Sequence, residues 1–135
     1  MSVVCRILAW ALPLLTAALL AAPAGAFDLN GAWATAPSLC RNVFKKQGDN
    51  VVLTTTSDLY GGGFIIEGNH VRGKFVTCNI ESNRQDGSTI HLSVACTTEI
   101  ATEQIQFDLK IVNDTTVAKM FPETNIAMDY HRCTL

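Results

Sequence analysis

The sequence predicts an all-β protein: a small antiparallel meander barrel of about eight strands, with two disulfides and one short helix or loop after the first strand. Three observations support this. Apolar and polar residues alternate with a period of two, most clearly over residues 103–112, where Ile105, Phe107 and Leu109 share one face. Clusters of Gly, Asn and Asp separate such segments. An even number of cysteines, four, follows residue 26.

Residues 1–26 have the plan of a secretory signal peptide. Arg6 precedes an apolar run over residues 7–22, and Ala24-Gly25-Ala26 fits a cleavage site. The run is shorter than the roughly 20 residues that span a bilayer. We therefore expect residues 27–135 to form a single domain of a secreted or periplasmic protein, with no membrane span after the signal is cleaved.

The expected strands follow in order along residues 27–135. The first covers residues 28–34, and Pro37 then starts a short helix or loop, because proline is accepted in a first helical turn. Seven further strands are predicted where turn residues interrupt the alternation: 51–56, 64–67, 70–81, 89–100, 103–112, 115–121 and 126–133. Residues 83–88 are predicted to be a polar turn. A closed barrel leaves no exposed strand edges, and a two-sheet sandwich is the alternative.

The alternation also predicts which side chains form the core. Each strand of a half-buried sheet places every second residue on the inner face. On this basis Val94, Phe107, Leu109 and Met128 should all be buried inside the barrel.

The hairpin centred on Gly87 predicts the disulfide pairing. The register that places Ile80 opposite Val94 also places Cys78 opposite Cys96. Cys40 is then left to pair with Cys133, which is one of the three connectivities that four cysteines allow. No C-x-x-C pair is present, so neither a zinc site nor a thioredoxin-like site is favoured.

Gly31-Ala32-Trp33 resembles the G-x-W signature of lipocalins and similar small barrels. In that family the Trp closes one end of the barrel, and an Arg near the last strand packs over its ring. The resemblance implies these structural roles for Trp33 and Arg132. The disulfide that would tie the C-terminus to the body is similar to a lipocalin feature. Among such barrels, the chain most resembles the compact periplasmic proteins that inhibit proteases or lysozyme.

Charge and motifs argue against several classes of function. The net charge of −2 gives no basic face for nucleic acid. No nucleophile elbow or phosphate-binding loop is present. His70, His91 and His131 are expected to be separate surface residues rather than metal ligands. We therefore expect no enzyme activity, no cofactor, no metal and no nucleic-acid partner.

The segment Tyr60-Gly61-Gly62-Gly63 is the most unusual local feature, and two interpretations stay open. It can be a wide turn or bulge in which glycines take positive φ. It can also be an exposed binding loop with Tyr60 as an aromatic anchor.

The second interpretation leads our functional hypothesis: a secreted or periplasmic binding module, inhibitor-like, that acts through exposed loops on another secreted or envelope protein. A carrier of a small apolar ligand in the barrel interior is the alternative, and an empty lumen above roughly 300 Å³ would favour it. A structural envelope protein without a discrete ligand is a third possibility.

Overall fold

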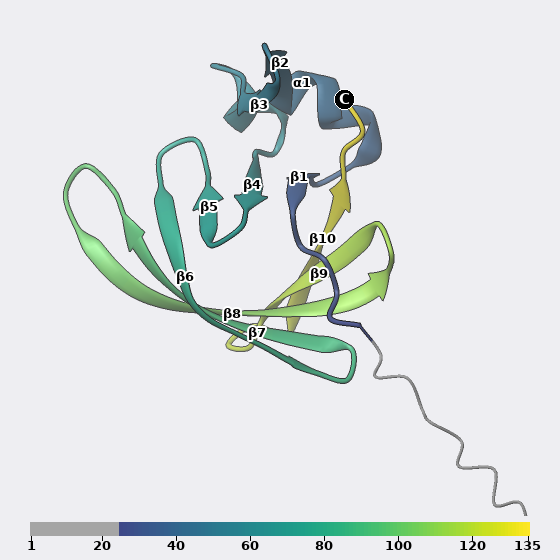
Figure 1. The fold of residues 1–135 in the computed structure, drawn as a ribbon, viewed down its shortest axis with the longest axis vertical. Helices are drawn as coiled ribbons and strands as arrows, with labels where there is room; N and C mark the ends of the chain where they lie inside the picture. Colours follow the sequence, from purple (N-terminus) through teal and green to yellow (C-terminus); the bar gives the residue numbers. More distant parts are fainter. Residues whose placement is uncertain (1–24) are drawn as a thin grey trace, which may run out of the picture.

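The structure is a computed structural model that describes residues 25–135. The predicted signal peptide, residues 1–26, lies outside the described residues except for its last two positions. Eight antiparallel strands close into a barrel in the order β1-β10-β9-β8-β7-β6-β5-β4, which confirms the predicted fold class (Figure 1). The barrel strands are β1 (Gly31–Ala34), β4 (Gly63–Glu67), β5 (His70–Arg72), β6 (Thr77–Asp86), β7 (Thr89–Thr97), β8 (Thr102–Asn113), β9 (Thr116–Phe121) and β10 (Ile126–Arg132).

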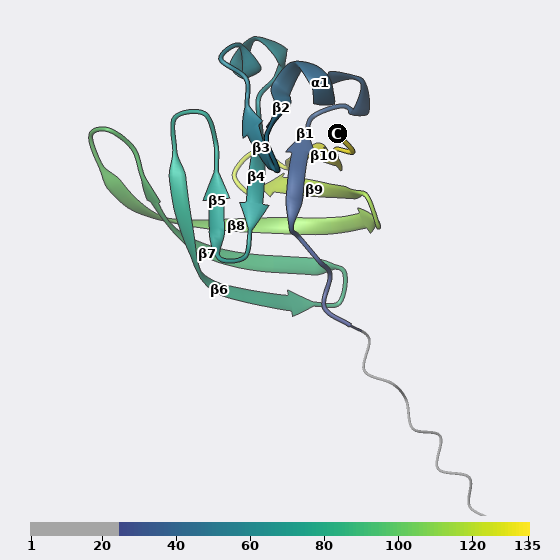
Figure 2. The same ribbon diagram turned by 45° about the horizontal axis from the view of Figure 1, so that its top comes forward.

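A small unit outside the barrel follows β1. It contains the short helices η1 (Pro37–Leu39) and α1 (Cys40–Val43) and a hairpin of β2 (Phe44–Gln47) with β3 (Asn50–Leu53). A further 3-10 helix, η2 (Ser57–Tyr60), leads back into β4. Figure 1 shows α1 and the β2–β3 hairpin together above β1 and β4, and Figure 2 shows the same unit beside the two strands after the top of the molecule has been turned forward. Residues 51–56 were predicted to be a barrel strand, and this was wrong: β3 pairs only with β2.

The hairpin leaves the barrel because it covers a second apolar surface. Alternation along β1 and β4 turns Ala32, Ala34 and Ile65 to the outside of the barrel, where Val43 and Phe44 pack on them. The two alanines let this layer approach the strands closely. The barrel nevertheless keeps eight strands, because the predicted strand 70–81 is divided near Gly73 into β5 and β6.

The inner core follows the predicted phase, with one exception. Val94 and Leu109 are buried, and Phe107 is half-buried against the same cluster. Met128 was expected to be buried but its side chain is 41% exposed. It lies opposite Lys119, near the start of β10, where the neighbouring inner-face residue Ile126 is also exposed, so this end of the strand lies at the solvent-exposed rim of the barrel.

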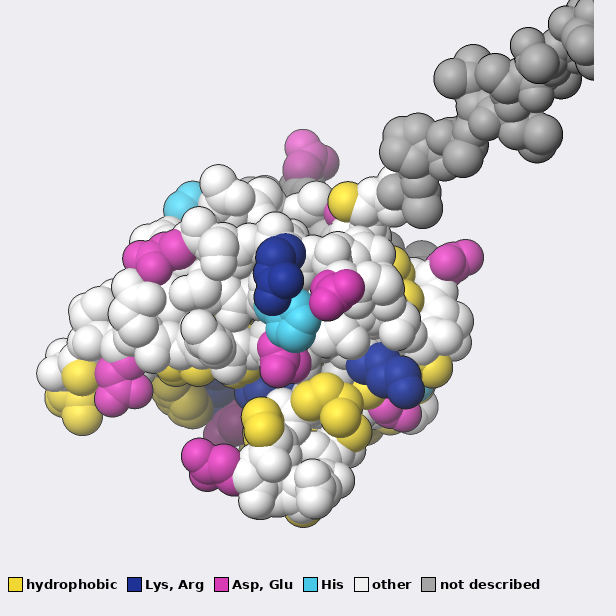
Figure 3. Space-filling model, turned by 90° about the horizontal axis from the view of Figure 1, so that it is seen from below, with side chains coloured by type: hydrophobic (Ala, Val, Ile, Leu, Met, Phe, Trp, Pro, Cys, Tyr) yellow, Lys and Arg dark blue, Asp and Glu magenta, His cyan; other side chains and the backbone are white. Residues whose placement is uncertain are grey.

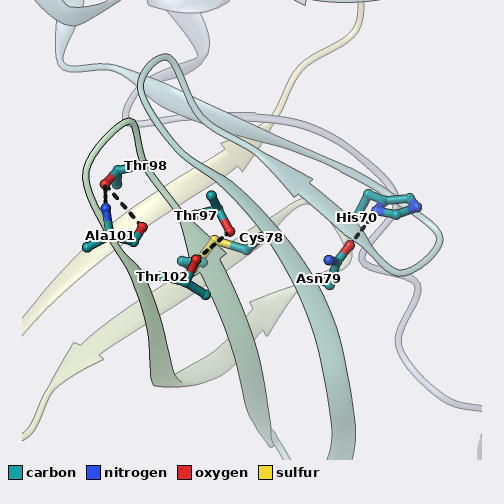
Figure 4. Close-up of a disulfide and its surroundings, with 8 residues drawn as sticks. His70, Cys78, Asn79, Thr97, Thr98, Ala101 and Thr102 are labelled. Carbon is teal, nitrogen blue, oxygen red and sulfur yellow. Dashed lines mark hydrogen bonds between the residues drawn. A yellow bond between two sulfur atoms is a disulfide. The ribbon is translucent and has the colours of Figure 1, made fainter.

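Both predicted disulfides are present. Cys78 pairs with Cys96 across β6 and β7, with Ile80 opposite Val94, and Cys40 is bonded to Cys133. Figure 4 shows the Cys78 surroundings, where His70 and Asn79 share a 2.9 Å hydrogen bond and the Thr97 and Thr102 hydroxyls lie 3.2 Å apart. In Figure 1 the C-terminus lies beside α1, as the Cys40–Cys133 bond requires.

The register of the β6–β7 pair changes after Ile80. A β-bulge places Ser82 opposite Ser93, so the strands continue to Asp86 opposite Thr89. The prediction of a turn over residues 83–88 was therefore wrong for residues 83–86, which are polar because this part of β6 is exposed. Within residues 25–135, no helix combines the length and apolarity needed to cross a membrane.

Candidate functional site

The two ends of the barrel differ in chemistry. Because successive barrel strands alternate in direction, the β5–β6, β7–β8 and β9–β10 loops lie at one end, which we call the open end. The connections at the other end, which we call the closed end, are short and polar: Gly68-Asn69, Gly87-Ser88 and Asp114-Thr115. The open-end loops instead carry exposed apolar side chains, among them Phe75 (71% exposed) and Ile100 (94% exposed). Figure 3 shows hydrophobic side chains on both sides of a recess in the lower part of that view.

Trp33 and Arg132 seal the closed end. The Trp33 ring is fully buried, and its Nε1 donates a 2.9 Å hydrogen bond to the Leu29 carbonyl. The Arg132 guanidinium carbon lies 4.4 Å from the centre of that ring, within the range of a cation–π contact. The same guanidinium donates to the backbone carbonyls of Asp28 and Asn30. This is the arrangement that the lipocalin resemblance implies for the two residues.

Asp28 is itself held in place at this end. Its carboxylate accepts hydrogen bonds from the backbone and side-chain amides of Asn30, each 2.9 Å long. These bonds favour the ionised form and hold the pKa of Asp28 below its usual range. The segment that Arg132 grips is therefore already fixed locally.

The open end contains a cavity of about 160 Å³. Gly73 and Val76 of the β5–β6 loop border it, which places it at the open end. Its walls come from seven of the eight barrel strands, β4 to β10, and the largest apolar contributors are Phe64, Ile66, Val71, Leu92, Phe107 and Leu109. Because these strands alternate with period two, the same pattern that predicted a barrel core also gives the cavity its apolar wall.

Two side chains with polar ends line this cavity, Lys119 and Tyr130. The Lys119 Nζ lies 4.3 Å from the ring centre of Phe107 and 4.9 Å from that of Phe121. Partial burial disfavours its charged form and lowers the pKa of Lys119. Tyr130 packs on Phe64 with ring centres 4.9 Å apart, and burial raises its pKa.

Lys119 has no acidic partner within the described part of the chain. The ion pairs found there join Arg72 to Glu67, Lys74 to Asp58 and His91 to Asp108. The cross-strand neighbours of Lys119 are Leu109 on β8 and Met128 on β10, both apolar. Lys119 is thus a cation on the wall of an apolar cavity, held against aromatic rings.

Of the predicted binding residues, Tyr60, Gly61 and Gly62 lie beside this cavity, and Gly63 lines it. Tyr60 is 40% exposed at the end of η2, next to exposed Leu59. Gly61 and Gly62 take positive φ values of 79° and 67°, as the turn interpretation requires. Lys74 of the β5–β6 loop donates a 2.5 Å hydrogen bond to the Thr55 carbonyl and pairs with Asp58, so this segment borders the open end.

Gly63 is different from the other two glycines. It already belongs to β4, and it borders the cavity. A Cβ at this position would lie 2.5 Å from the Trp33 carbonyl oxygen and 2.8 Å from the Phe44 ring. The glycine therefore allows β4 to lie close to β1 and to the outer layer.

Sequence reasoning missed Lys119, although a signal was present. In β9 (Thr116–Phe121), Lys119 is in phase with Val117, which is fully buried, and with Phe121. A lysine on the apolar face of an alternating strand marks an inward-facing charge.

A second hollow lies on the outer face of β6, β7 and β8. It measures about 230 Å³ and is polar, with Arg84, His91 and Asp108 in its wall. The register places these three side by side, and His91 Nδ1 lies 2.6 Å from Asp108 Oδ1. Basic, histidine and acidic side chains adjoin near the centre of Figure 3. Across residues 25–135, no three His, Cys, Asp or Glu side chains are grouped to hold a metal ion.

Comparisons with protein-family models, curated proteins and solved structures found no match to this chain. The fold and the cavity define its class: a small disulfide-linked β-barrel, sealed at one end by Trp33 and Arg132 and open at the other.

Proposed function

We propose that this protein is an extracytoplasmic binding protein that takes the apolar part of a small molecule into the open end of its barrel. The observation that carries the proposal is the apolar cavity of about 160 Å³. An apolar cavity of roughly 150 Å³ can hold a benzene-sized group. The volume is below the roughly 300 Å³ of a carrier that encloses a whole drug-sized ligand, so the criterion stated above for such a carrier is not met. The proposed ligand therefore enters with one end, and its remainder contacts exposed apolar side chains at the rim, such as Met128.

Two features support a location outside the cytoplasm. The Cys40–Cys133 and Cys78–Cys96 bonds fit an oxidising compartment. The predicted signal peptide would direct the chain to secretion or to export into a periplasm. A carrier of poorly soluble molecules is one role that suits such a compartment.

A neutral fluorescent probe, N-phenyl-1-naphthylamine, tests the cavity. We expect the protein to bind it and 1-hexanol to displace it. Val71→Phe fills the cavity from its wall and should weaken probe binding about ten-fold or more, since the added ring takes the place of the ligand. Val112→Phe adds the same ring at an exposed position of β8 and should leave binding unchanged.

Folding of each variant is checked by near-UV circular dichroism. If Val71→Phe does not fold, Leu92→Ile is used instead, because it changes the shape of the cavity at nearly constant volume and should change the relative affinities for linear and branched alcohols. Equal probe binding by the Val71→Phe and Val112→Phe variants, or no binding by the natural chain, would contradict the proposal.

A second candidate function is favoured by the adjacent exposed side chains of Leu59 and Tyr60. These could anchor a partner protein from the envelope, as hot-spot aromatics do. Tyr60→Ala should then leave the melting temperature nearly unchanged and abolish capture of that partner from an envelope extract, whereas Tyr60→Phe should preserve capture. A partner retained equally by the alanine variant would rule out this role for Tyr60.

A further inference from the structure

We infer that the cavity selects ligands that carry an anionic head group on an apolar body, such as a monocarboxylate, and that Lys119 binds the head group. This inference rests on the function proposed above for the same cavity. It adds the chemical class of the ligand and the residue that recognises it.

The position of Lys119 follows from strand register. Val117 and Lys119 occupy the same face of β9, and Val117 is part of the inner core. Lys119 lies opposite Leu109, which lines the cavity, and opposite Met128 at the rim. The side chain thus starts between the apolar floor and the solvent, and its methylene groups can lie along the wall.

Among the described residues, none supplies a counter-ion to the Lys119 ammonium group. Asp108 and Asp129 directly adjoin in sequence the two residues that pair with Lys119. Because neighbouring residues of a strand point to opposite faces, both carboxylates point to the outer face of the barrel. Asp108 is also paired with His91 there. The rings of Phe107 and Phe121 are the contacts that stabilise the cation, and an aromatic face only partly replaces water or a carboxylate. An anionic ligand would supply the missing partner.

Tyr130 gives the same cavity a second donor. It follows Met128 by two residues, so Lys119 and Tyr130 are diagonal neighbours on the inner face of the β9–β10 pair, roughly 7–8 Å apart at the backbone. A carboxylate accepts several hydrogen bonds through its two oxygens. An ammonium and a phenol hydroxyl on one wall therefore match a carboxylate better than an alcohol, which carries no charge.

Matched acids and alcohols test the inference. Hexanoate is compared with 1-hexanol, and 3-phenylpropanoate with 3-phenyl-1-propanol, by displacement of N-phenyl-1-naphthylamine at pH 7 and low salt. The natural chain should bind each acid about ten-fold or more tightly than its alcohol, because a charge-assisted contact is added to the same apolar burial. Lys119→Met keeps the apolar stem and should abolish the preference, whereas Lys119→Arg should retain it.

Lys110→Met is the control for net charge. Lys110 lies on β8 opposite Ala118, is exposed, and points to the outer face, so its loss should leave the preference intact. Lys119→Met should also remain folded. Burial lowers the pKa of Lys119, so its charged form costs stability at every pH below that pKa, and removing the charge relieves the cost at pH 7.

The outcomes separate the two proposals. If alcohols and acids bind the natural chain equally, or if the preference survives Lys119→Met, the inference is wrong while the cavity remains a binding site. If none of the four compounds binds, the proposed function fails as well.

Discussion

Arg132 joins the last strand to the segment that precedes the first. Its guanidinium contacts the Trp33 ring and donates to two backbone carbonyls more than 100 residues away in sequence, at separations of 102 and 104. The planar fork of arginine suits this combination of stacking and paired donation, which lysine cannot reproduce.

Arg132→Met should therefore lower the free energy of unfolding by about 2–3 kcal/mol, because it removes a cation–π contact and two hydrogen bonds from a charged donor, each weakened by exposure to solvent. Urea unfolding followed by the fluorescence of Trp33 measures the change. Arg84→Met, at an exposed position of β6, should change stability by no more than about 0.5 kcal/mol. Equal effects of the two substitutions would show that Arg132 is not important for closing the barrel.

Gly63→Ala should be more harmful than Gly68→Ala. At Gly63 the added Cβ would overlap the Trp33 backbone, and overpacking of this kind costs about 1–3 kcal/mol. At Gly68 the added Cβ meets open space, and only the positive φ of 59° opposes it, at about 1 kcal/mol. Chemical denaturation of both variants gives the comparison, and a smaller loss at Gly63 would indicate that β1 and β4 can separate locally.

The sequence predicted the closed end of the barrel better than the cavity. Trp33 and Arg132 carry a recognisable pattern, whereas the cavity is formed by ordinary apolar residues that also fit a filled core. Whether such residues meet at the barrel axis depends on side-chain packing in three dimensions, which alternation does not specify. Lys119 was missed as well, although its phase within β9 marks an inward charge and could have identified it.

At the scale of elements, the alternation of apolar and polar residues located β7 and β8, but it missed the second half of β6 and misassigned the short β3. β7 and β8 lie close to their predicted ranges, because nine and twelve residues show a clear period. The four residues of β3 have the same β-forming character as a barrel strand, yet they pair with β2. Only the outward-facing Ala32, Ala34 and Ile65 explain this, since they provide a second surface to cover.

The two disulfides should contribute unequally. Cys40 and Cys133 are separated by 93 residues and Cys78 and Cys96 by 18, so loop-closure entropy predicts about 4–5 and about 3 kcal/mol respectively. Replacing each pair by alanines and measuring urea unfolding tests the order. A larger loss from the Cys78/Cys96 double variant would mean that native contacts, rather than chain entropy, dominate the effect.

At the scale of the whole molecule, residues 25–135 form two separate apolar clusters. One fills the barrel, and the other lies between the outer face of β1 and β4 and the unit of α1, β2 and β3. The Cys40–Cys133 bond ties the smaller cluster to the C-terminal segment.

Hydrogen exchange should therefore separate the two clusters once that bond is removed. In the Cys40→Ala/Cys133→Ala protein, the amides of β2 and β3 should exchange much faster, while those of β7 and β8 stay protected. The Cys78→Ala/Cys96→Ala protein should show no such selective loss in the hairpin. Uniform acceleration in the first variant would mean that the two clusters unfold as one cooperative unit.

The closure of the barrel through β1 and β10 has a consequence for how the chain folds. The hairpins of β6, β7, β8 and β9 connect neighbours in sequence, so they can form early at low entropic cost. The seam between β1 and β10 joins the two ends of the domain and must wait until the last strand is available. If the chain is exported from its N-terminus, β1 crosses the membrane first, but its edge that faces β10 stays unpaired until β10 has crossed the membrane as well. Substitutions at the seam, Arg132 included, should then accelerate unfolding far more than they slow refolding.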